Sequence, residues 1–372
     1  MTMSRTGSDS LVQSNALDLE SSFVGVEDNE VVRLREWGTN QFFALRAPQD
    51  LRQVAVAAAT VLQPPISDRT PAIAMNNVEF LYEGQTWRVR DLSGVASLRQ
   101  DGSPTREVRL TAGTEVGIAH RTFIAESARS IALRNFCSRL LGWGDDRIAV
   151  VDRALRAIRL ASAGRAVLVL RGRGELIWIT HSIHRHTLGG QAPFVVSDPR
   201  RKNTVATVRG PANYACGLEA LRWAARGTLC VHAERLPRDY RKVLRVVGGP
   251  ENDVRLAMCT EISTRHAAAL FDVAAQIDIP DLDARRSDLP RIVSEYIEDA
   301  MNILSAPDGC LDEKDINWIL ERSALGNRIT IPGIEKAVLR MVAIRMTESR
   351  TDAARLLGVR QVSLENWIRR RR

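Results

Sequence analysis

The sequence predicts a chain of several domains: a β-sandwich, then an α/β domain built on a parallel sheet, then a small all-α domain. Three observations lead to this fold class. Short alternating strands separated by turns fill residues 31–126. Buried strand runs separated by helical stretches fill residues 127–286, and helical periodicity alone continues from 287 to 372. A chain of 372 residues has room for two or three buried cores.

The charge of the chain is strongly positive, with a formal net charge of +8 and a pI near 9.7. Such a balance suits a nucleic-acid partner without proving one. Arginine carries nearly all of the positive charge, because the chain contains only four lysines: Lys202, Lys242, Lys314 and Lys336.

The cysteines and the apolar runs point to the cytoplasm. The five cysteines are scattered and form no CxxC pair, which is typical of reduced thiols. No apolar run approaches the roughly 20 residues of a membrane helix, and no export signal is recognisable. We therefore expect a cytoplasmic, nucleoid-associated protein without membrane contact.

The N-terminal region begins with a stretch rich in Ser, Asp, Glu and Asn, so residues 1–30 are expected to form a disordered leader. Residues 31–126 then contain segments that alternate between apolar and polar side chains, with Gly, Asp, Asn and Pro between them. The segments are VEFLYEG, QTWRVRDL, REVRLTAGTEVGI and RTFIAE. This pattern predicts a β-sandwich.

The run WRVRDLSGVASLRQDG followed by VRLTAGTEVGIAHRTFI resembles a forkhead-associated (FHA) domain, a reader of phosphothreonine peptides. The phosphate-gripping residues of that family are missing here. Alanines in Val54–Thr60 replace its Gly-Arg, the segment AIAMNNVEF has no Ser-Arg, and Ala96 stands where its loop Asn would be. A phosphate needs several converging charge-assisted donors. We therefore expect an FHA-like sandwich that serves packing or protein partners rather than phosphopeptides.

Residues 127–286 have the pattern of an α/β domain. Helical periodicity appears in SARSIALRNFCSRLLGW and DRALRAIRLASA, and buried strand runs in AVLVL, GTLCVHA and VRLAMCT. The order from AVLVL through APFVVSDPR, GLEALRWAARGTLCVHAERLPRDYRKVLRVV and IDIPDLDARRSDLP resembles the AAA+ module of bacterial enhancer-binding activators of the sigma-54 RNA polymerase. The resemblance implies an ATPase fold whose helical lid covers residues 287–330. The segment GNRITIPGIEKAV (326–338) resembles the family's lid and its link to the C-terminal helices.

The loop that would cradle the ATP phosphates lacks its lysine. Strand AVLVL is followed by Arg171, Gly172, Arg173, Gly174, Glu175 and Leu176. A phosphate loop needs a Lys on the β/γ-phosphates, and the first lysine of the chain comes only at position 202. Arg173 could replace the charge, but a planar guanidinium does not fit a cradle shaped for an ammonium.

The acidic pair that would hold Mg²⁺ is also replaced. In GTLCVHAE the matching positions are His232 and Ala233, and Glu234 comes one residue late. Mg²⁺ prefers hard oxygen ligands, so His232 is a poor substitute. Glu261 stands after Thr260 where the family has Asn. Arg265 matches a trans-acting arginine with Ser263 at its partner position, and Arg328 matches the lid arginine.

These replacements predict a chain without ATPase activity and without a cofactor. The degenerate nucleotide-binding positions implied by the resemblance are Gly172, Arg173, Gly174, Glu175, His232 and Arg328. The stretch Lys202–Gly217 contains no Phe-Thr pair, so the GAFTGA loop with which the family contacts the sigma factor is missing. His181, His184 and His186 cluster in THSIHRHT, but no Cys or acidic partner lies close by, so no metal site is expected.

The last stretch, TESRTDAARLLGVRQVSLENWIRRRR, has the pattern of a helix-turn-helix. Ala353 and Ala354 fall where the two helices meet, Leu357 on the inner face and Gly358 in the turn; Val359, Leu364 and Trp367 anchor the second helix. The opposite face offers donors and acceptors for base edges, and the chain ends in arginines suited to phosphates. The expected DNA-binding residues are Arg360, Gln361, Ser363, Asn366, Arg369, Arg370, Arg371 and Arg372.

Residues 331–372 resemble a Fis-type DNA-binding domain. An apolar stripe runs along the preceding helix through Ile334, Ala337, Val338, Met341 and Ile344. In that family the helix pairs with its twofold mate, which implies a homodimer or higher oligomer; packing on its own helix-turn-helix is the alternative.

The combined expectation is a sequence-specific regulator of transcription that binds double-stranded DNA and acts as a scaffold, repressor or co-regulator. Two alternatives stay open: an ATP-dependent sigma-54 activator with a divergent nucleotide pocket, and a pseudoenzyme that joins assemblies of an active relative.

Overall fold

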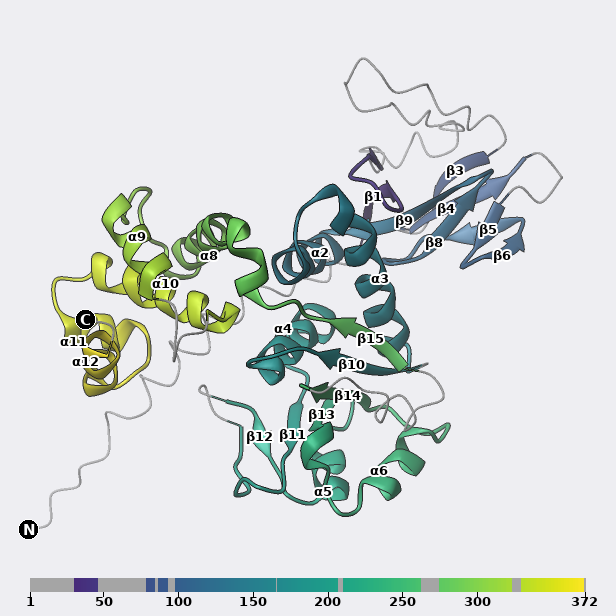
Figure 1. The fold of residues 1–372 in the computed structure, drawn as a ribbon. Coiled ribbons are helices and arrows are strands. Elements are labelled where there is room, and N and C mark those ends of the chain that lie inside the picture. The colour runs from purple at the N-terminus through teal and green to yellow at the C-terminus, as the bar shows by residue number, and fades with distance from the viewer. Residues whose placement is uncertain are drawn as a thin grey trace, which may run out of the picture. The chain divides into compact units, whose positions relative to one another are not determined.

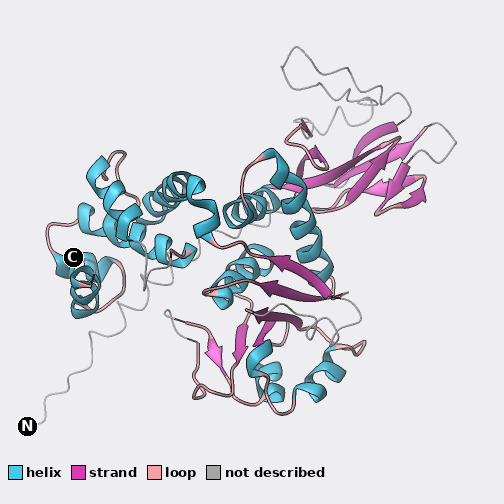
Figure 2. Ribbon diagram, in the orientation of Figure 1, coloured by secondary structure: helices cyan, strands magenta, loops and turns pink. Residues whose placement is uncertain are grey.

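The computed structural model describes residues 30–45, 78–83, 86–92, 98–164, 166–206, 210–261, 274–322 and 329–370. These residues divide into two compact units. One unit contains residues up to 170 together with 180–277, and the other contains 171–179 together with 278 onward. Figures 1 and 2 show a strand-rich N-terminal region, an α/β region and a helical C-terminal region, in the predicted order.

Two antiparallel sheets form the strand-rich region. The larger has the order β2-β1-β9-β8-β5-β6 and the smaller the order β3-β4-β7. Alternation within the strands explains their shared core, because Trp87 and Val89 of β4 point inward together with Leu34 of β1 and Val116 of β8. The strands are β1 Val31–Glu36, β2 Phe42–Ala44, β3 Val78–Glu83, β4 Thr86–Asp91, β5 Leu98–Gln100, β6 Ser103–Thr105, β7 Glu107–Arg109, β8 Glu115–Ile118 and β9 Arg121–Ser127.

The segment REVRLTAGTEVGI, treated above as one run, is in fact two strands in different sheets. β7 pairs with β4 of the smaller sheet, whereas β8 pairs with β5 and β9 of the larger one. Between them the chain turns at Thr111–Thr114, where the two threonine hydroxyls lie 2.8 Å apart and Gly113 has a φ of +85°. A residue with positive φ interrupts an extended strand, which accounts for the break.

Helix α2 (Ala128–Leu141) follows β9 without a loop because Ser127 and Ser130 form a capping box. The backbone N–H of Ser130 donates to the Ser127 hydroxyl (3.2 Å), and the N–H of Ser127 donates to the Ser130 hydroxyl (2.7 Å). Helix α3 (Asp145–Ser162) packs against α2 and begins with two acidic residues that suit its N-terminus.

A buried ion network joins α3 to the sandwich. Arg35 of β1 is fully buried and donates from Nε to Glu126 of β9 (2.7 Å) and from both terminal nitrogens to Asp152 of α3. Arg33 donates to the other oxygen of Glu126 (2.7 Å). Both carboxylates are therefore paired and hydrogen-bonded, as buried charges require.

The α/β region contains a six-stranded sheet with the order β12-β11-β13-β14-β10-β15. Strand β11 pairs in parallel with β12 and with β13, and β13 pairs in parallel with β14. Its core contains Leu229, Met258, Ala220 and Val243, all completely buried. The strands are β10 Val167–Arg171, β11 Phe194–Ser197, β12 Ala212–Asn213, β13 Thr228–His232, β14 Arg255–Thr260 and β15 Ala274–Asp278; the helices are α4 Leu176–Leu188, α5 Gly217–Trp223, η3 Ala233–Arg235 and α6 Tyr240–Val247.

The C-terminal region is helical: η4 Leu282–Asp288, α8 Leu289–Leu304, α9 Glu313–Arg322, α10 Ile331–Met346, α11 Arg350–Leu356 and α12 Gln361–Arg369. Helices α8 and α10 pack together, and Ile292 of α8 and Val338 of α10 are completely buried. Arg345 of α10 forms a two-pronged ion pair with Asp315 of α9, at 2.7 and 2.8 Å. Within the ranges that the structure describes, no helix has the length and apolar character to cross a membrane.

Candidate nucleic-acid interface

Helices α11 and α12 form a tightly packed pair at the C-terminus. α11 starts after Ser349, whose side chain accepts the N–H of Asp352 as an N-cap. Ala353 and Ala354 of α11 are buried, at 0% and 2% exposed, and α11 packs against both α10 and α12.

The turn between the helices spans residues 357–360 and depends on Gly358. The N–H of Gly358 donates to the carbonyl of Arg355 (3.0 Å), and the N–H of Val359 donates to the carbonyl of Ala354 (2.9 Å). This pair of bonds is a Schellman motif, which needs a left-handed residue directly after the helix. Gly358 supplies it with a φ of +62°.

Helix α12 begins at Gln361, so Arg360 lies at the N-cap rather than on the helix as expected. Its backbone is extended, and its carbonyl accepts the N–H groups of Ser363 (2.8 Å) and Leu364 (3.2 Å). Leu364 is completely buried. Trp367 is 6% exposed and packs against Trp318 of α9, with ring centroids 5.4 Å apart.

The face of α12 away from this core carries the expected base-contacting residues. Arg360, Gln361 and Ser363 are exposed, and Asn366 is half-buried. The Thr351 hydroxyl donates to the amide oxygen of Gln361 (2.9 Å), whose amide nitrogen donates to Glu365 (2.8 Å). The amide orientation of Gln361 is therefore fixed from both sides.

The terminal arginines are only partly described. Arg369 and Arg370 are exposed, and Arg369 donates to the side-chain oxygen of Asn366 at 2.7 Å. Arg371 and Arg372 lie outside the described residues. One further candidate was missed by the sequence reasoning: Val362 is 64% exposed on the same helix. The sequence pattern that could have indicated Val362 is an apolar residue between the polar Gln361 and Ser363. The methyl groups of a valine at this position suit contact with a thymine methyl.

The expected phosphate loop lies between β10 and α4 and is four residues long, from Gly172 to Glu175. Its two glycines are separated by one residue, whereas a phosphate loop of the GxxxxGK type has four between them. Gly172 serves close packing instead, because a Cβ there would lie 2.8 Å from the carbonyl oxygen of Ile279.

The arginine before this loop and the arginine within it both pair with carboxylates. Arg171 pairs with Asp278 at 2.6 Å, and Arg173 pairs with Asp281 at 3.5 Å. The Arg173 pair is more than two-fifths exposed on both sides and is therefore weak. It still places a negative charge beside the guanidinium of Arg173, which was considered and rejected above as a substitute for the lysine, and this charge disfavours a phosphate there.

At the end of β13, Glu234 bridges two strands. Its Oε1 accepts the hydroxyl of Thr260 (2.7 Å) and the backbone N–H of Glu261 (2.9 Å) at the end of β14. Burial raises the pKa of Glu234, but these hydrogen bonds outweigh it and leave the pKa below the ordinary value. Burial, with repulsion from Arg235, lowers the pKa of His232. In the described structure, Thr260 and Glu234 are therefore hydrogen-bonded to each other.

Several expectations lie outside the described residues. Ser263, Arg265 and Arg328 belong to such segments, as do Val54–Thr60 and Ala96.

The histidine cluster has a packing role. His184 lies between the Thr228 hydroxyl (2.8 Å) and the carbonyl of Ala192 (3.0 Å). Burial lowers the pKa of both His181 and His184 to about 4. Among the described residues, no group of three or more His, Cys, Asp or Glu side chains could hold a metal ion.

No family model and no curated protein matches the chain. Among solved structures, NtrX from Brucella abortus in complex with ADP is 14% identical over 66% of this chain and 73% of that chain, with a TM-score of 0.35. Its complex with ATP is 18% identical over the same shares, with a TM-score of 0.29. A full-length MCM homolog from Methanopyrus kandleri is 15% identical over 78% and 73%, with a TM-score of 0.22. At such TM-scores the assignment depends on the residues themselves.

Proposed function

We propose that the chain is a sequence-specific DNA-binding regulator of transcription that reads the major groove with α12. The observation that carries the proposal is the packing of α11 on α12, with Ala353 and Ala354 buried, a Gly358 turn and an exposed polar face. Two helices joined by a three- or four-residue turn with Gly are the elements of a DNA-reading helix-turn-helix. The N-terminal part of the second helix then meets the base edges.

The proposal assigns separate roles to the polar residues. Arg360, Gln361, Ser363 and Asn366 would contact base edges, because their donors and acceptors match those of the major groove. Arg369 through Arg372 would contact phosphates, which fixes position without reading sequence. The fixed amide of Gln361 supports this division, because a bidentate contact with adenine needs the oxygen and nitrogen in defined places.

The α/β region is proposed to be a degenerate AAA+-like scaffold without ATPase activity. Support comes from the four-residue loop, the arginine–carboxylate pairs beside it, and the use of Glu234 in holding Thr260. A thermal-shift titration with ATP and Mg²⁺ tests this part, since a ligand that binds the native state must stabilise it. A flat response is expected; a clear rise in Tm would favour the divergent activator instead.

We still propose an oligomer, but the surface of α10 that is available for a dimer interface is smaller than expected. Ile334, Ala337 and Val338 of α10 are buried within the protomer, whereas Met341 and Ile344 are half-buried. The first three residues of the stripe therefore pack inside the protomer. Met341 and Ile344 are the part of the stripe that we propose for contact with a second, twofold-related copy. Light scattering at several protein concentrations measures the oligomeric state.

The test of DNA binding is fluorescence anisotropy with a labelled duplex of random sequence and with selected duplexes. The Arg360→Glu variant is expected to lose binding to both, because the introduced carboxylate would face base acceptors inside a groove lined by negatively charged DNA. Arg241→Glu, at an exposed site on α6, is the matched control and should bind normally. Equal loss in the two variants, or no binding by the wild type, would refute the proposed function.

A further inference from the structure

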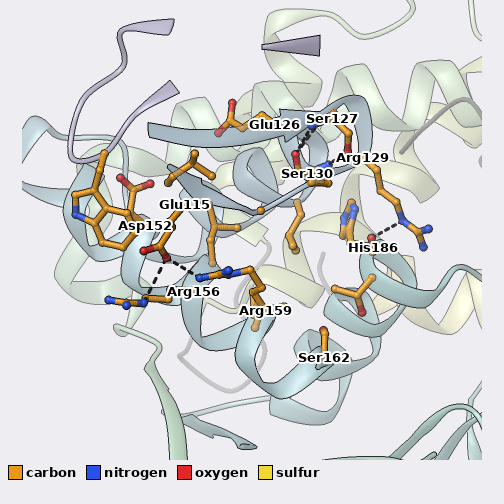
Figure 3. A pocket seen from close by; sticks show the side chains of 18 residues that line it. Glu115, Glu126, Ser127, Arg129, Ser130, Asp152, Arg156, Arg159, Ser162 and His186 are labelled. Atoms are coloured by element: carbon orange, nitrogen blue, oxygen red, sulfur yellow. Dashed lines mark hydrogen bonds and ion pairs between the residues drawn. The ribbon is translucent and has the colours of Figure 1, made fainter. Parts of the chain in front are cut away.

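A cavity of about 240 Å³ lies where the sandwich meets α2, α3 and the end of α4 (Figure 3). Arg156 and Arg159 on one wall both pair with Glu115, at 3.3 and 2.9 Å. Arg129 donates to the backbone carbonyl of His186 at 2.6 Å. The remaining lining carboxylates are those of the buried ion network, which are paired as well. The charged groups that line the cavity thus have partners within the protein, and we assign no ligand to it.

Val362 lies at the centre of the face of α12 that the proposed function assigns to the major groove. It precedes the buried anchor Leu364 by two positions and the anchor Trp367 by five. At about 100° per residue, these steps place its side chain about 200° and about 140° around the helix from the two anchors. The side chain therefore points almost directly away from the core of the helix pair, and it is 64% exposed.

Helix stability does not account for a valine at this position. An exposed side chain gains little from packing, and a β-branched residue loses side-chain freedom in a helix, so alanine or glutamine would suit the helix better. Among the described residues of α11 and α12, Val362 is the one exposed large apolar side chain. Its neighbours Gln361 and Ser363 are polar, and Asn366 follows one helical turn later. An apolar group at the centre of a polar face favours a role in binding.

The chemistry of the major groove decides what an apolar side chain can contact there. All base pairs expose hydrogen-bond donors or acceptors at this edge, and thymine alone adds an apolar group, its C5-methyl. A valine set against a donor or acceptor would remove water from that group without replacing the hydrogen bond, which costs free energy. At the position opposite Val362, thymine is therefore favoured and the other unmodified bases are disfavoured.

We propose that Val362 is a specificity-determining residue and that it contacts the C5-methyl group of a thymine in the target duplex. The inference rests on the proposed function, because it requires α12 to lie in the major groove. It adds an apolar contact to the polar base contacts of that proposal. 5-Methylcytosine carries the same methyl group at the same place on the ring, so it is read like thymine at this position, whereas cytosine is not.

The test removes one methyl group at a time from the DNA. The full chain first selects a motif from a random duplex library, and each thymine of the motif is then replaced by deoxyuridine, which differs from thymidine only in lacking the methyl. At the thymine that Val362 contacts, anisotropy titrations should show a loss of affinity of about four-fold, as expected for burial of one methyl-sized group. With cytosine placed there instead, methylation at C5 should raise the affinity by a similar factor.

Protein variants assign the effect to Val362. Val362→Ser removes both methyl groups of the side chain and should bind the thymine and deoxyuridine duplexes equally well. Val362→Ile keeps a branched apolar side chain and should keep the preference for the methyl. Val246→Ser makes the same change at a valine of α6 that is 50% exposed, and should behave as the wild type. Circular dichroism verifies that each variant is folded.

The outcomes separate this inference from the proposed function. If the wild type enriches no motif, the proposed function fails and this inference fails with it. If the wild type enriches a motif that contains no thymine, or one in which deoxyuridine replaces every thymine without loss, only the role of Val362 is overturned. The same holds if Val362→Ser keeps the wild-type preference for the methyl. A change in oligomeric state of Val362→Ser with that preference intact would assign Val362 to contact with a second copy of the chain.

Discussion

Thr351 of α11 holds Gln361 of α12 by a hydrogen bond of 2.9 Å between the hydroxyl and the amide oxygen. This hydrogen bond links the two helices on their exposed side, opposite the buried Ala353 and Leu364. It presents one amide of the proposed reading face in a defined orientation. A group held in place before binding loses less conformational freedom when a complex forms.

The first prediction concerns this hydrogen bond. Thr351→Val removes the hydroxyl, and we expect discrimination between the preferred and a random duplex to fall about 2- to 10-fold, the worth of one hydrogen bond. Thr351→Ser keeps the hydroxyl and should retain most of the discrimination. Anisotropy titrations measure both; identical behaviour of the Val and Ser variants would show that Thr351 does not orient Gln361 for reading.

The second prediction concerns the terminal arginines. Replacing Arg369, Arg370, Arg371 and Arg372 by Gln should weaken binding to every duplex by a similar factor. The slope of log affinity against log salt should flatten by about 0.9 for each phosphate that the arginines no longer neutralise. Affinities measured over a range of salt concentrations test this. An unchanged slope would mean that these arginines lie away from the phosphates.

The third prediction concerns the turn. Gly358→Ala places a Cβ on a residue with a φ of +62°, which should cost about 1–2 kcal/mol. Both DNA binding and the stability of the C-terminal unit should suffer. Gly190→Ala is the control, since Gly190 has an ordinary φ and open space around its Cβ position. Denaturant titration measures the free energy of unfolding of each variant. Equal effects of the two substitutions would contradict the role of Gly358 in the turn.

Much of the C-terminal half could be predicted from the sequence, because its signals are local. Helical periodicity was expected from residue 287 onward, and α8 (Leu289–Leu304) lies in this region. The small residues, the turn glycine and the anchors Leu364 and Trp367 follow from helical spacing alone. The sequence did not predict that Arg360 lies before α12, at its N-cap. An arginine is not one of the residues whose side chain caps a helix, so it does not mark a helix start.

Long-range relationships could not be predicted in this way. Asp152 meets Arg35 across 117 residues, and nothing near either residue indicates the partner. The cavity beside them depends on the packing of separate elements, so no motif marked it. The division of β7 and β8 between two sheets likewise depends on strand pairing rather than on alternation, which both strands share.

The fourth prediction concerns pH. His184 has a folded-state pKa of about 4, against about 6.5 for an unfolded histidine. The unfolded state therefore binds more protons between these values. The contribution of His184 to the free energy of unfolding is therefore fully present above about pH 6.5. It falls by up to about 1.4 kcal/mol per pH unit as the pH is lowered toward 4.

Removing this histidine should flatten that dependence. Tm measured from pH 7 to pH 4 is expected to fall less steeply in His184→Gln than in the wild type, whatever the offset at pH 7. His120→Gln, at an exposed histidine, is the control and should follow the wild type. A wild-type slope in His184→Gln would show that this imidazole is not held neutral by burial.

The central claim, sequence-specific DNA binding through α12, is tested most directly by selection from a random duplex library. The wild-type chain and a variant carrying Arg360→Ala and Gln361→Ala are compared under the same salt conditions. We expect the wild type to enrich one motif and the double variant to lose or relax that motif while still retaining DNA. Failure of the wild type to enrich any motif, or enrichment of the same motif with equal strength by the variant, would contradict the claim.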